Sequence, residues 1–122
     1  MLTLVVPDYD DAIAHYVGDW GFELLEDRSL SPEKRWVRVA PKGSPTGFLL
    51  AKAANPDQVR AIGYQTGGRV FLFLHVDNLH ELVAQWTHAG MHIEGPIRTE
   101  DYGFVCVVQD RYGNRWDVIQ PA

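Results

Sequence analysis

The amino-acid sequence predicts an α+β fold made of two similar βαβββ modules. The pattern Leu-Val-Val-Pro-Asp near the N-terminus returns in the second half as Leu-His-Val-Asp-Asn, with Val6 and Val76 placed 70 residues apart. In each half a helix-like pattern follows, ends at a glycine, and gives way to three short strand-like segments. A unit that recurs at one spacing predicts two copies of the same structure.

Each module is expected to hold one amphipathic helix. Asp8 precedes the first helix and Asn78 the second, and both side chains can accept hydrogen bonds from the free amide groups of a first turn. Gly21 and Gly90 are placed to end the two helices. Apolar residues at intervals of three or four define one buried face of each: Ala12, Ile13, Tyr16, Val17 and Trp20 in the first, and Leu79, Leu82, Val83 and Trp86 in the second.

Eight short segments rich in β-branched and aromatic residues are expected to be strands. The first is centred on Val5, and the others span residues 22–27, 36–40, 48–51, 70–76, 91–93, 105–109 and 116–119. The connecting stretch at 52–69 is expected to carry a short helical turn. We expect one domain, with module one at about residues 1–53, a connector at about 54–68 and module two at about 69–122.

Composition narrows the class of protein. A chain of 122 residues suffices for one globular domain, and 11 Lys and Arg against 16 Asp and Glu give a formal net charge of −5. This charge disfavours nucleic acid and anionic membranes as partners and favours a cationic ligand. The sequence holds one cysteine, no membrane-spanning apolar stretch and no signal-peptide pattern, so we expect a cytoplasmic protein.

Two features at fixed places in the modules indicate a known family. Gly21-Phe22 closes the first helix, and an Asp-x-x-Gly-Asn turn at Asp110–Asn114 precedes the last strand. Together with the two βαβββ units they resemble the vicinal oxygen chelate superfamily, which includes glyoxalase I, extradiol dioxygenases and fosfomycin- and bleomycin-resistance proteins. The resemblance covers essentially the whole chain. It implies paired curved mixed sheets around an open cavity, formed within one chain or across a homodimer.

The resemblance also implies positions for a divalent metal, on the first and last strand of each module. The matching positions here are Met1 and Leu49 in module one and Phe71 and Asp117 in module two. Only Asp117 can bind a hard or borderline cation, and His75, four residues after Phe71 on the same strand face, is the side chain that can join it. Two ligands fall short of the three that a catalytic zinc site keeps, so we predict no metal cofactor. If a divalent metal does bind, Asp117 and His75 are its predicted ligands.

Alternation along the strands assigns a set of side chains to the predicted cavity. The set is aromatic with a few polar groups, which is typical of sites for small molecules. The predicted ligand-binding residues are Trp36, Arg38, Phe71, Phe73, His75, Tyr102, Arg115 and Asp117.

Several of these residues have a structural explanation as well. Phe71 and Phe73 are also explained as core residues, because eight strands need apolar filling. His75 is also explained as a hydrogen-bonded structural histidine. Tyr102, before a glycine, is either a lid residue or a turn aromatic that covers a strand edge.

The charged members of the set and the lone cysteine carry alternatives of their own. Asp117 can form a structural ion pair with Arg38 or Arg115 instead of meeting a ligand. Trp36 is either a stacking platform beside Arg38 or a rim residue. Cys106 is expected to face the core and to be unreactive.

The sequence therefore supports three functional hypotheses. The first is a metal-free protein of the glyoxalase/bleomycin-resistance-like group that binds a small, partly aromatic molecule in its cavity. The second is a metal-dependent lyase, isomerase or dioxygenase of the same superfamily, in which a divalent metal polarises vicinal oxygens. The third is a dimerising or regulatory unit whose cavity is filled by its own aromatic side chains. One fold hosts all three, so the fold does not separate them.

Overall fold

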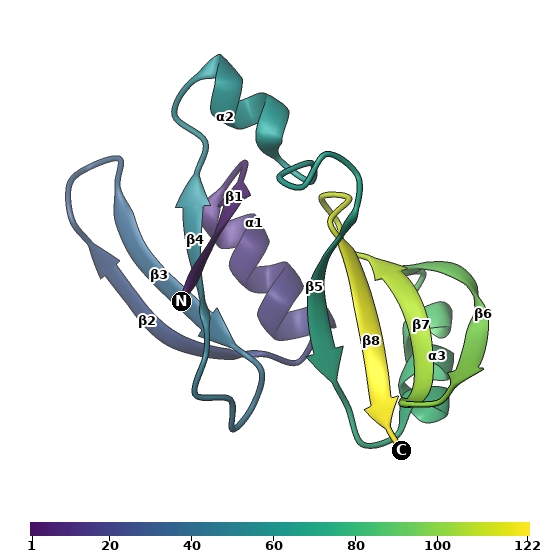
Figure 1. Cartoon of the computed structure of the whole chain (residues 1–122). Helices are drawn as coiled ribbons and strands as arrows, with labels where there is room; N and C mark the ends of the chain where they lie inside the picture. The colour runs from purple at the N-terminus through teal and green to yellow at the C-terminus, as the bar shows by residue number, and fades with distance from the viewer. The chain divides into compact units, whose positions relative to one another are not determined.

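The computed structural model describes all 122 residues and confirms the α+β fold with two βαβββ modules. The chain divides into two compact units, Met1–Ile62 and Gly63–Ala122, each holding one module (Figure 1). No helix has the length and hydropathy that crossing a membrane requires.

The first unit is a four-stranded mixed sheet with one helix along a face. Its strands have the order β1-β4-β3-β2, with β1 parallel to β4 and the other pairs antiparallel. The expected helical turn after the sheet is present as α2. The elements are β1 (Leu2–Val6), α1 (Tyr9–Ile13), η1 (Ala14–Asp19), β2 (Glu23–Ser29), β3 (Arg35–Ala40), β4 (Phe48–Lys52) and α2 (Pro56–Ala61).

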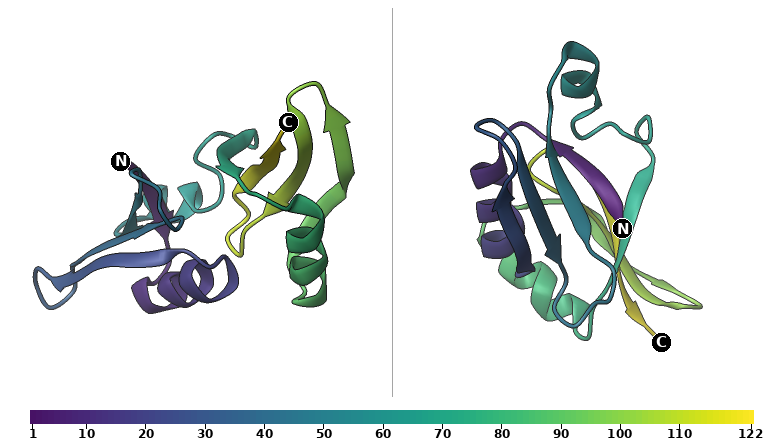
Figure 2. Two further views of the ribbon diagram at one scale, coloured as in Figure 1. Left: turned by 90° about the horizontal axis from the view of Figure 1, so that it is seen from below. Right: turned by 90° about the vertical axis from the view of Figure 1, so that its left-hand side faces the viewer.

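The second unit repeats this architecture. Its strands have the equivalent order β5-β8-β7-β6, again with one parallel pair, β5 and β8. Helix α3 lies along one face of the sheet, as α1 does in the first unit (Figure 2). The elements are β5 (Val70–His75), α3 (Leu79–His88), β6 (His92–Glu100), β7 (Gly103–Gln109) and β8 (Arg115–Pro121).

Both predicted helix caps are present. The Asp8 carboxylate accepts a hydrogen bond from the amide of Asp11 at 2.8 Å, and the Asn78 side chain accepts one from the amide of Glu81 at 3.2 Å. Each bond satisfies an amide group that the helix itself leaves free, so the same device starts the helix in both modules.

The first helix differs from the prediction in its second half. From Ala14 to Asp19 it continues as a π-helix, in which the amide of Trp20 bonds to the carbonyl of His15. The wider turn rotates the buried face, so that His15 rather than Val17 is buried. The His15 imidazole Nδ1 lies 2.7 Å from an Asp19 carboxylate oxygen, which satisfies this buried polar group.

Strand β6 is longer than predicted. The sequence predicts that this strand ends at residue 93, because glycine and proline follow. In the structure it continues through a β-bulge to Glu100. Gly95 adopts φ +72°, which an L side chain rarely adopts, and Pro96 needs no ladder partner on this edge strand. Strand β2, at the equivalent edge of the first sheet, also has a register shift, between Leu24 and Glu26.

The turn between β7 and β8 is held by one buried carboxylate. Asp110, which is 4% exposed, accepts hydrogen bonds at 3.0 Å from the amides of Tyr112 and Asn114, from the Asn114 side chain and from the indole of Trp116. Trp116 is fully buried against the helix side of the sheet. The turn motif therefore fixes the start of β8 and the face that each of its side chains takes.

Replacing Asp110 tests this role. We expect Asp110→Ala to lower the free energy of unfolding by about 3 kcal/mol or more, because it leaves buried donors of Asn114 and Trp116 without an acceptor. Urea unfolding measures the change. Asp101→Ala, in the exposed turn between β6 and β7, is the control and should change stability by less than about 0.5 kcal/mol. Equal stability of the two variants would contradict the role given to Asp110.

Candidate functional site

Each sheet has one face that points away from the helix of its own module, here called the open face. Strand alternation places the candidate residues there, because their neighbours in sequence are buried under the helix. In β5, Leu72 and Leu74 are 5% and 8% exposed, whereas Phe73 between them is 65% exposed. The open face of the second unit carries Phe71, Phe73, His75, Glu94, Val107, Gln109, Arg115 and Asp117.

The structure decides between alternatives at two of these residues. Phe73 is too exposed to be a core residue, so the core explanation is wrong for it, while Phe71 is half-buried. His75 is exposed at the end of β5, which does not favour its alternative explanation as a hydrogen-bonded structural histidine. Phe73 lies directly opposite Asp117, and His75 opposite Ile119, in the β5–β8 register.

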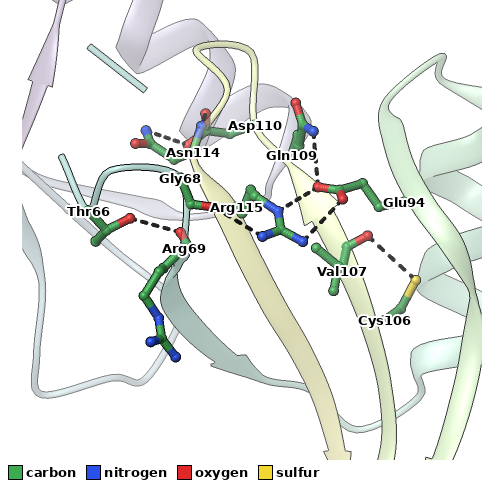
Figure 3. A network of polar contacts seen from close by, with 10 residues as sticks. All are labelled: Thr66, Gly68, Arg69, Glu94, Cys106, Val107, Gln109, Asp110, Asn114 and Arg115. Atoms are coloured by element: carbon green, nitrogen blue, oxygen red, sulfur yellow. Dashed lines mark hydrogen bonds and ion pairs between the residues drawn. The ribbon is translucent and has the colours of Figure 1, made fainter. Parts of the chain in front are cut away.

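Arg115 pairs with Glu94, not with Asp117. Its guanidinium donates to both Glu94 carboxylate oxygens, at 2.9 and 3.2 Å, and to the carbonyl of Gly68 at 3.1 Å (Figure 3). The Gln109 side-chain amide donates to the same carboxylate at 3.0 Å. Hydrogen bonds from Arg115, followed by the one from Gln109, hold the pKa of Glu94 below its ordinary value. This network ties β6, β7 and β8 to the turn that precedes β5.

Asp117 is left without such a network. Its register partners are Phe73 on β5 and Val107 on β7, and neither side chain has a polar atom. The Oδ1 atom of Asp117 is buried and has no hydrogen-bond partner. The structural ion pair with Arg115 that the sequence left open is therefore not formed.

The open face of the first unit carries a different charged group. Arg38 donates to the Glu26 carboxylate at 2.6 Å, and Arg28 lies 3.9 Å from the same carboxylate. The hydrogen bond from Arg38 lowers the pKa of Glu26, and a weaker contribution comes from a hydrogen bond from the Trp36 side chain. Arg38 is thus engaged within its own sheet, and Trp36 is held beside it.

A cavity of about 750 Å³ opens next to Trp36 in the first unit. This volume lies within the range of small-molecule sites, roughly 300–1,000 Å³. Of the residues predicted from sequence, it contains Trp36. The full lining is Tyr9, Leu30, Ser31, Glu33, Lys34, Arg35, Trp36, Leu49, Leu50, Ala51, Lys52, Ala53, Ala54 and Gln58.

The cavity wall around Tyr9 is fixed by Arg35. The Arg35 guanidinium lies 5.2 Å from the centre of the Tyr9 ring and forms ion pairs with Asp10 at 2.8 Å and Asp27 at 2.7 Å. The Tyr9 hydroxyl also accepts a hydrogen bond from the Arg35 amide at 3.3 Å. Hydrogen bonds from Arg35 lower the pKa of Asp27. Asp10 does not line the cavity itself and acts on this wall through its ion pair with Arg35.

Another part of the cavity lining comes from the connection into α2. Asn55 caps α2 by accepting from the amide of Gln58 at 2.9 Å, and the Gln58 side chain accepts from the amide of Ala54 at 2.8 Å. These two bonds place Gln58 at the cavity. Sequence reasoning identified neither this part of the lining nor Glu94, although the Asn-Pro start of α2 is a recognisable helix signal.

Two further sequence predictions are located by the structure. Tyr102 lies in the turn between β6 and β7 and is 52% exposed, outside the described cavity. Cys106 is fully buried on the helix side of β7, and burial raises the pKa of its thiol, in keeping with the prediction of an unreactive core residue.

The donor set does not fit a chelated divalent metal. Of the four positions that match the metal positions of the family, Met1, Leu49 and Phe71 have no suitable donor, and Asp117 has one carboxylate between apolar neighbours. No group of three His, Cys, Asp or Glu residues that could hold a metal ion occurs among the 122 residues. A catalytic zinc site keeps about three protein ligands.

Comparison with known proteins agrees with the fold. Residues 1–118 match the family model described as Glyoxalase/Bleomycin resistance protein/Dioxygenase superfamily. The chain is 45% identical over 121 residues to an uncharacterized protein of Shewanella frigidimarina (strain NCIMB 400), covering 98% of this chain and 90% of that protein. This chain belongs to the glyoxalase/bleomycin resistance protein/dioxygenase superfamily, also called the vicinal oxygen chelate superfamily.

Solved structures of similar proteins include two with high coverage. The crystal structure of UcmS2 has a TM-score of 0.81 and 26% identity, covering 97% of this chain and 93% of that one. TnmS3, described as an antibiotic binding protein from Streptomyces sp. CB03234, has a TM-score of 0.71 and 28% identity, covering 98% and 93%.

The Glu94–Arg115 pair predicts a pH dependence of stability. The pKa of Glu94 is lower in the folded protein than its ordinary value of 4.5, so the pair stabilises the fold above about pH 4.5 and loses this effect as the pH falls through the folded pKa. We expect Glu94→Gln to lower the free energy of unfolding by about 1 kcal/mol at neutral pH and by much less in acid, since both side chains are partly exposed.

Urea unfolding of both proteins at about pH 7 and about pH 3 measures this difference. Glu23→Gln is the control, because Glu23 is exposed at the start of β2 and belongs to no ion pair. A cost of Glu94→Gln that stays constant between the two pH values would contradict the assignment.

Proposed function

We propose that this chain is a small-molecule-binding protein with a ligand cavity beside Trp36 in its first unit and further contact residues on the open face of its second unit. The observation that carries the proposal is the cavity of about 750 Å³ in the first unit, with Trp36 and Tyr9 in its walls. Its aromatic side chains can supply affinity, and polar groups such as Gln58 and Lys52 at the same cavity can orient a ligand. The description of TnmS3 as an antibiotic binding protein supports the same class of function.

The proposed ligand-binding residues keep the set that the sequence predicts, with roles that follow from their environments. Trp36 contacts the ligand directly, and Arg38 acts by fixing the Glu26 carboxylate, to which the Trp36 side chain also donates. On the second open face, exposed or half-buried side chains offer contacts, with Arg115 fixed by Glu94. These are Phe71, Phe73, His75, Arg115 and Asp117, together with Tyr102 from the adjoining turn.

The family resemblance also supports a homodimer as the assembled state. Sedimentation equilibrium measures this directly. A mass of one chain of 13.8 kDa at all concentrations would contradict it.

Trp36 provides the test of the binding function. The sequence has four tryptophans, and Trp20, Trp86 and Trp116 are 6%, 4% and 0% exposed, so quenching by an added aromatic molecule reports mainly on half-buried Trp36. With naphthalenemethanol as the neutral aromatic probe, we expect saturable quenching. In calorimetry, Trp36→Ala should weaken binding about tenfold with little change in melting temperature.

Leu25→Ala is the matched control, because Leu25 is an exposed apolar residue on neighbouring β2 that does not line the cavity. It should leave the affinity unchanged. Absence of saturable binding, or equal affinity of the wild type and Trp36→Ala, would overturn the proposal.

A further inference from the structure

Asp117 carries a buried oxygen that nothing in the chain satisfies. It lies in the middle of β8, and its Oδ1 atom has no hydrogen-bond partner. Leaving a buried acceptor unpaired destabilises a fold, and the effect is larger for a charged group than for a neutral one. A half-buried carboxylate with one buried, unsatisfied oxygen therefore needs a reason other than the stability of the sheet.

The cations on this open face are already engaged. Arg115, two residues before Asp117 on the same face, donates to both oxygens of Glu94 and to the carbonyl of Gly68. Arg98 on β6 pairs with Glu100 at 3.2 Å. Arg115 feels the charge of Asp117, but neither arginine forms an ion pair or a hydrogen bond with the Asp117 carboxylate.

The fold does not require an acid at this position. Leu49 in β4 is the equivalent residue of the first unit, 68 positions earlier, and lies opposite Thr3 as Asp117 lies opposite Phe73. An apolar residue thus suffices for the same architecture in the first module. Asp117 is a feature of the second open face alone.

The side chain next to Asp117 suits an organic cation. Phe73 lies opposite it across the β5–β8 ladder and is 65% exposed. The face of an aromatic ring attracts a positive charge, and a carboxylate accepts a short, strong hydrogen bond from a protonated nitrogen. The two residues together offer a protonated nitrogen both interactions, and they offer a carboxylate ligand neither.

We propose that the ligand of this protein carries a protonated nitrogen beside a flat apolar group, and that this nitrogen lies against the Phe73 ring and donates a hydrogen bond to Asp117. The inference rests on the proposed function, since it names the chemical class of the ligand for that function. The net charge of −5 favours the approach of such a cation.

Three probes with the same ring separate the effect of charge from that of the ring: naphthylmethylammonium, naphthalenemethanol and naphthoate. Calorimetric titration of the whole chain gives their affinities. We expect the ammonium probe to bind about tenfold tighter than the alcohol, and the naphthoate to bind most weakly.

Asp117→Asn should remove the preference for the ammonium probe and leave the affinity for the alcohol unchanged. Asp101→Asn is the matched control, because it removes one negative charge from an exposed turn of the same unit without altering the open face. It should keep the preference.

The outcomes separate the two proposals. If the alcohol binds as tightly as the ammonium probe, or Asp117→Asn keeps the preference, the inference about Asp117 is overturned and the binding function stands. If none of the three probes binds, the proposed function is overturned and the inference with it.

A stability measurement tests the premise without any ligand. Asp117→Leu places at this position the residue that the first module has there, and it should raise the melting temperature, because it removes a carboxylate oxygen that is buried without a hydrogen bond. A fall in melting temperature would show that Asp117 has a stabilising partner and would overturn the inference. A rise in melting temperature on adding Zn²⁺ or Ni²⁺ would also overturn the inference if Asp117→Asn abolished it, since the carboxylate would then be a metal ligand.

Discussion

The buried carboxylate of Asp110 is the interaction on which the second module depends. By accepting from two backbone amides of its own turn, it fixes the reversal between β7 and β8. By accepting from the indole of Trp116, it fixes which side of β8 faces the helix. Successive side chains of a strand point to opposite faces of the sheet. Because Trp116 faces the helix, its neighbours Arg115 and Asp117 lie on the open face. The contact of Asp110 with Trp116 on the helix side of β8 thus determines which polar side chains of β8 lie on the open face.

The two modules share what the fold needs and differ in what a ligand would meet. Each has a capped helix, a mixed sheet of the same order and an irregular second strand, and each buries aliphatic residues under its helix. The open faces have diverged. The first has a Glu26–Arg38 pair beside Trp36, and the second has an Arg115–Glu94 network beside an unpaired acid. Because the residues that hold the fold are separate from those on the open faces, the open faces can change while the fold stays the same.

Much of the fold could be predicted from the sequence, because helix caps, apolar periodicity and strand alternation are local signals. The π-helix from Ala14 was missed, since a 3.6-residue period fits the same apolar positions nearly as well. Glu94 was missed because Gly95 and Pro96 are typical of a turn, whereas here they form a bulge within an edge strand. The cavity was only partly predicted. Trp36 follows from alternation. Gln58 is placed by side-chain hydrogen bonds to Ala54 and Asn55, which a helix signal alone does not specify. Tyr9 is placed by its contact with Arg35, 26 residues away in the sequence.

Amide chemical shifts measured by NMR during addition of naphthylmethylammonium would test most directly the claim that the open face of the second module recognises a cation. The account predicts that the largest changes fall on β5 and β8, centred on Phe73 and Asp117, with small changes at the buried helix-facing residues between them. Largest changes at the acidic start of the first helix, Asp8–Asp11, would mean that the probe responds to surface charge alone and would contradict the account.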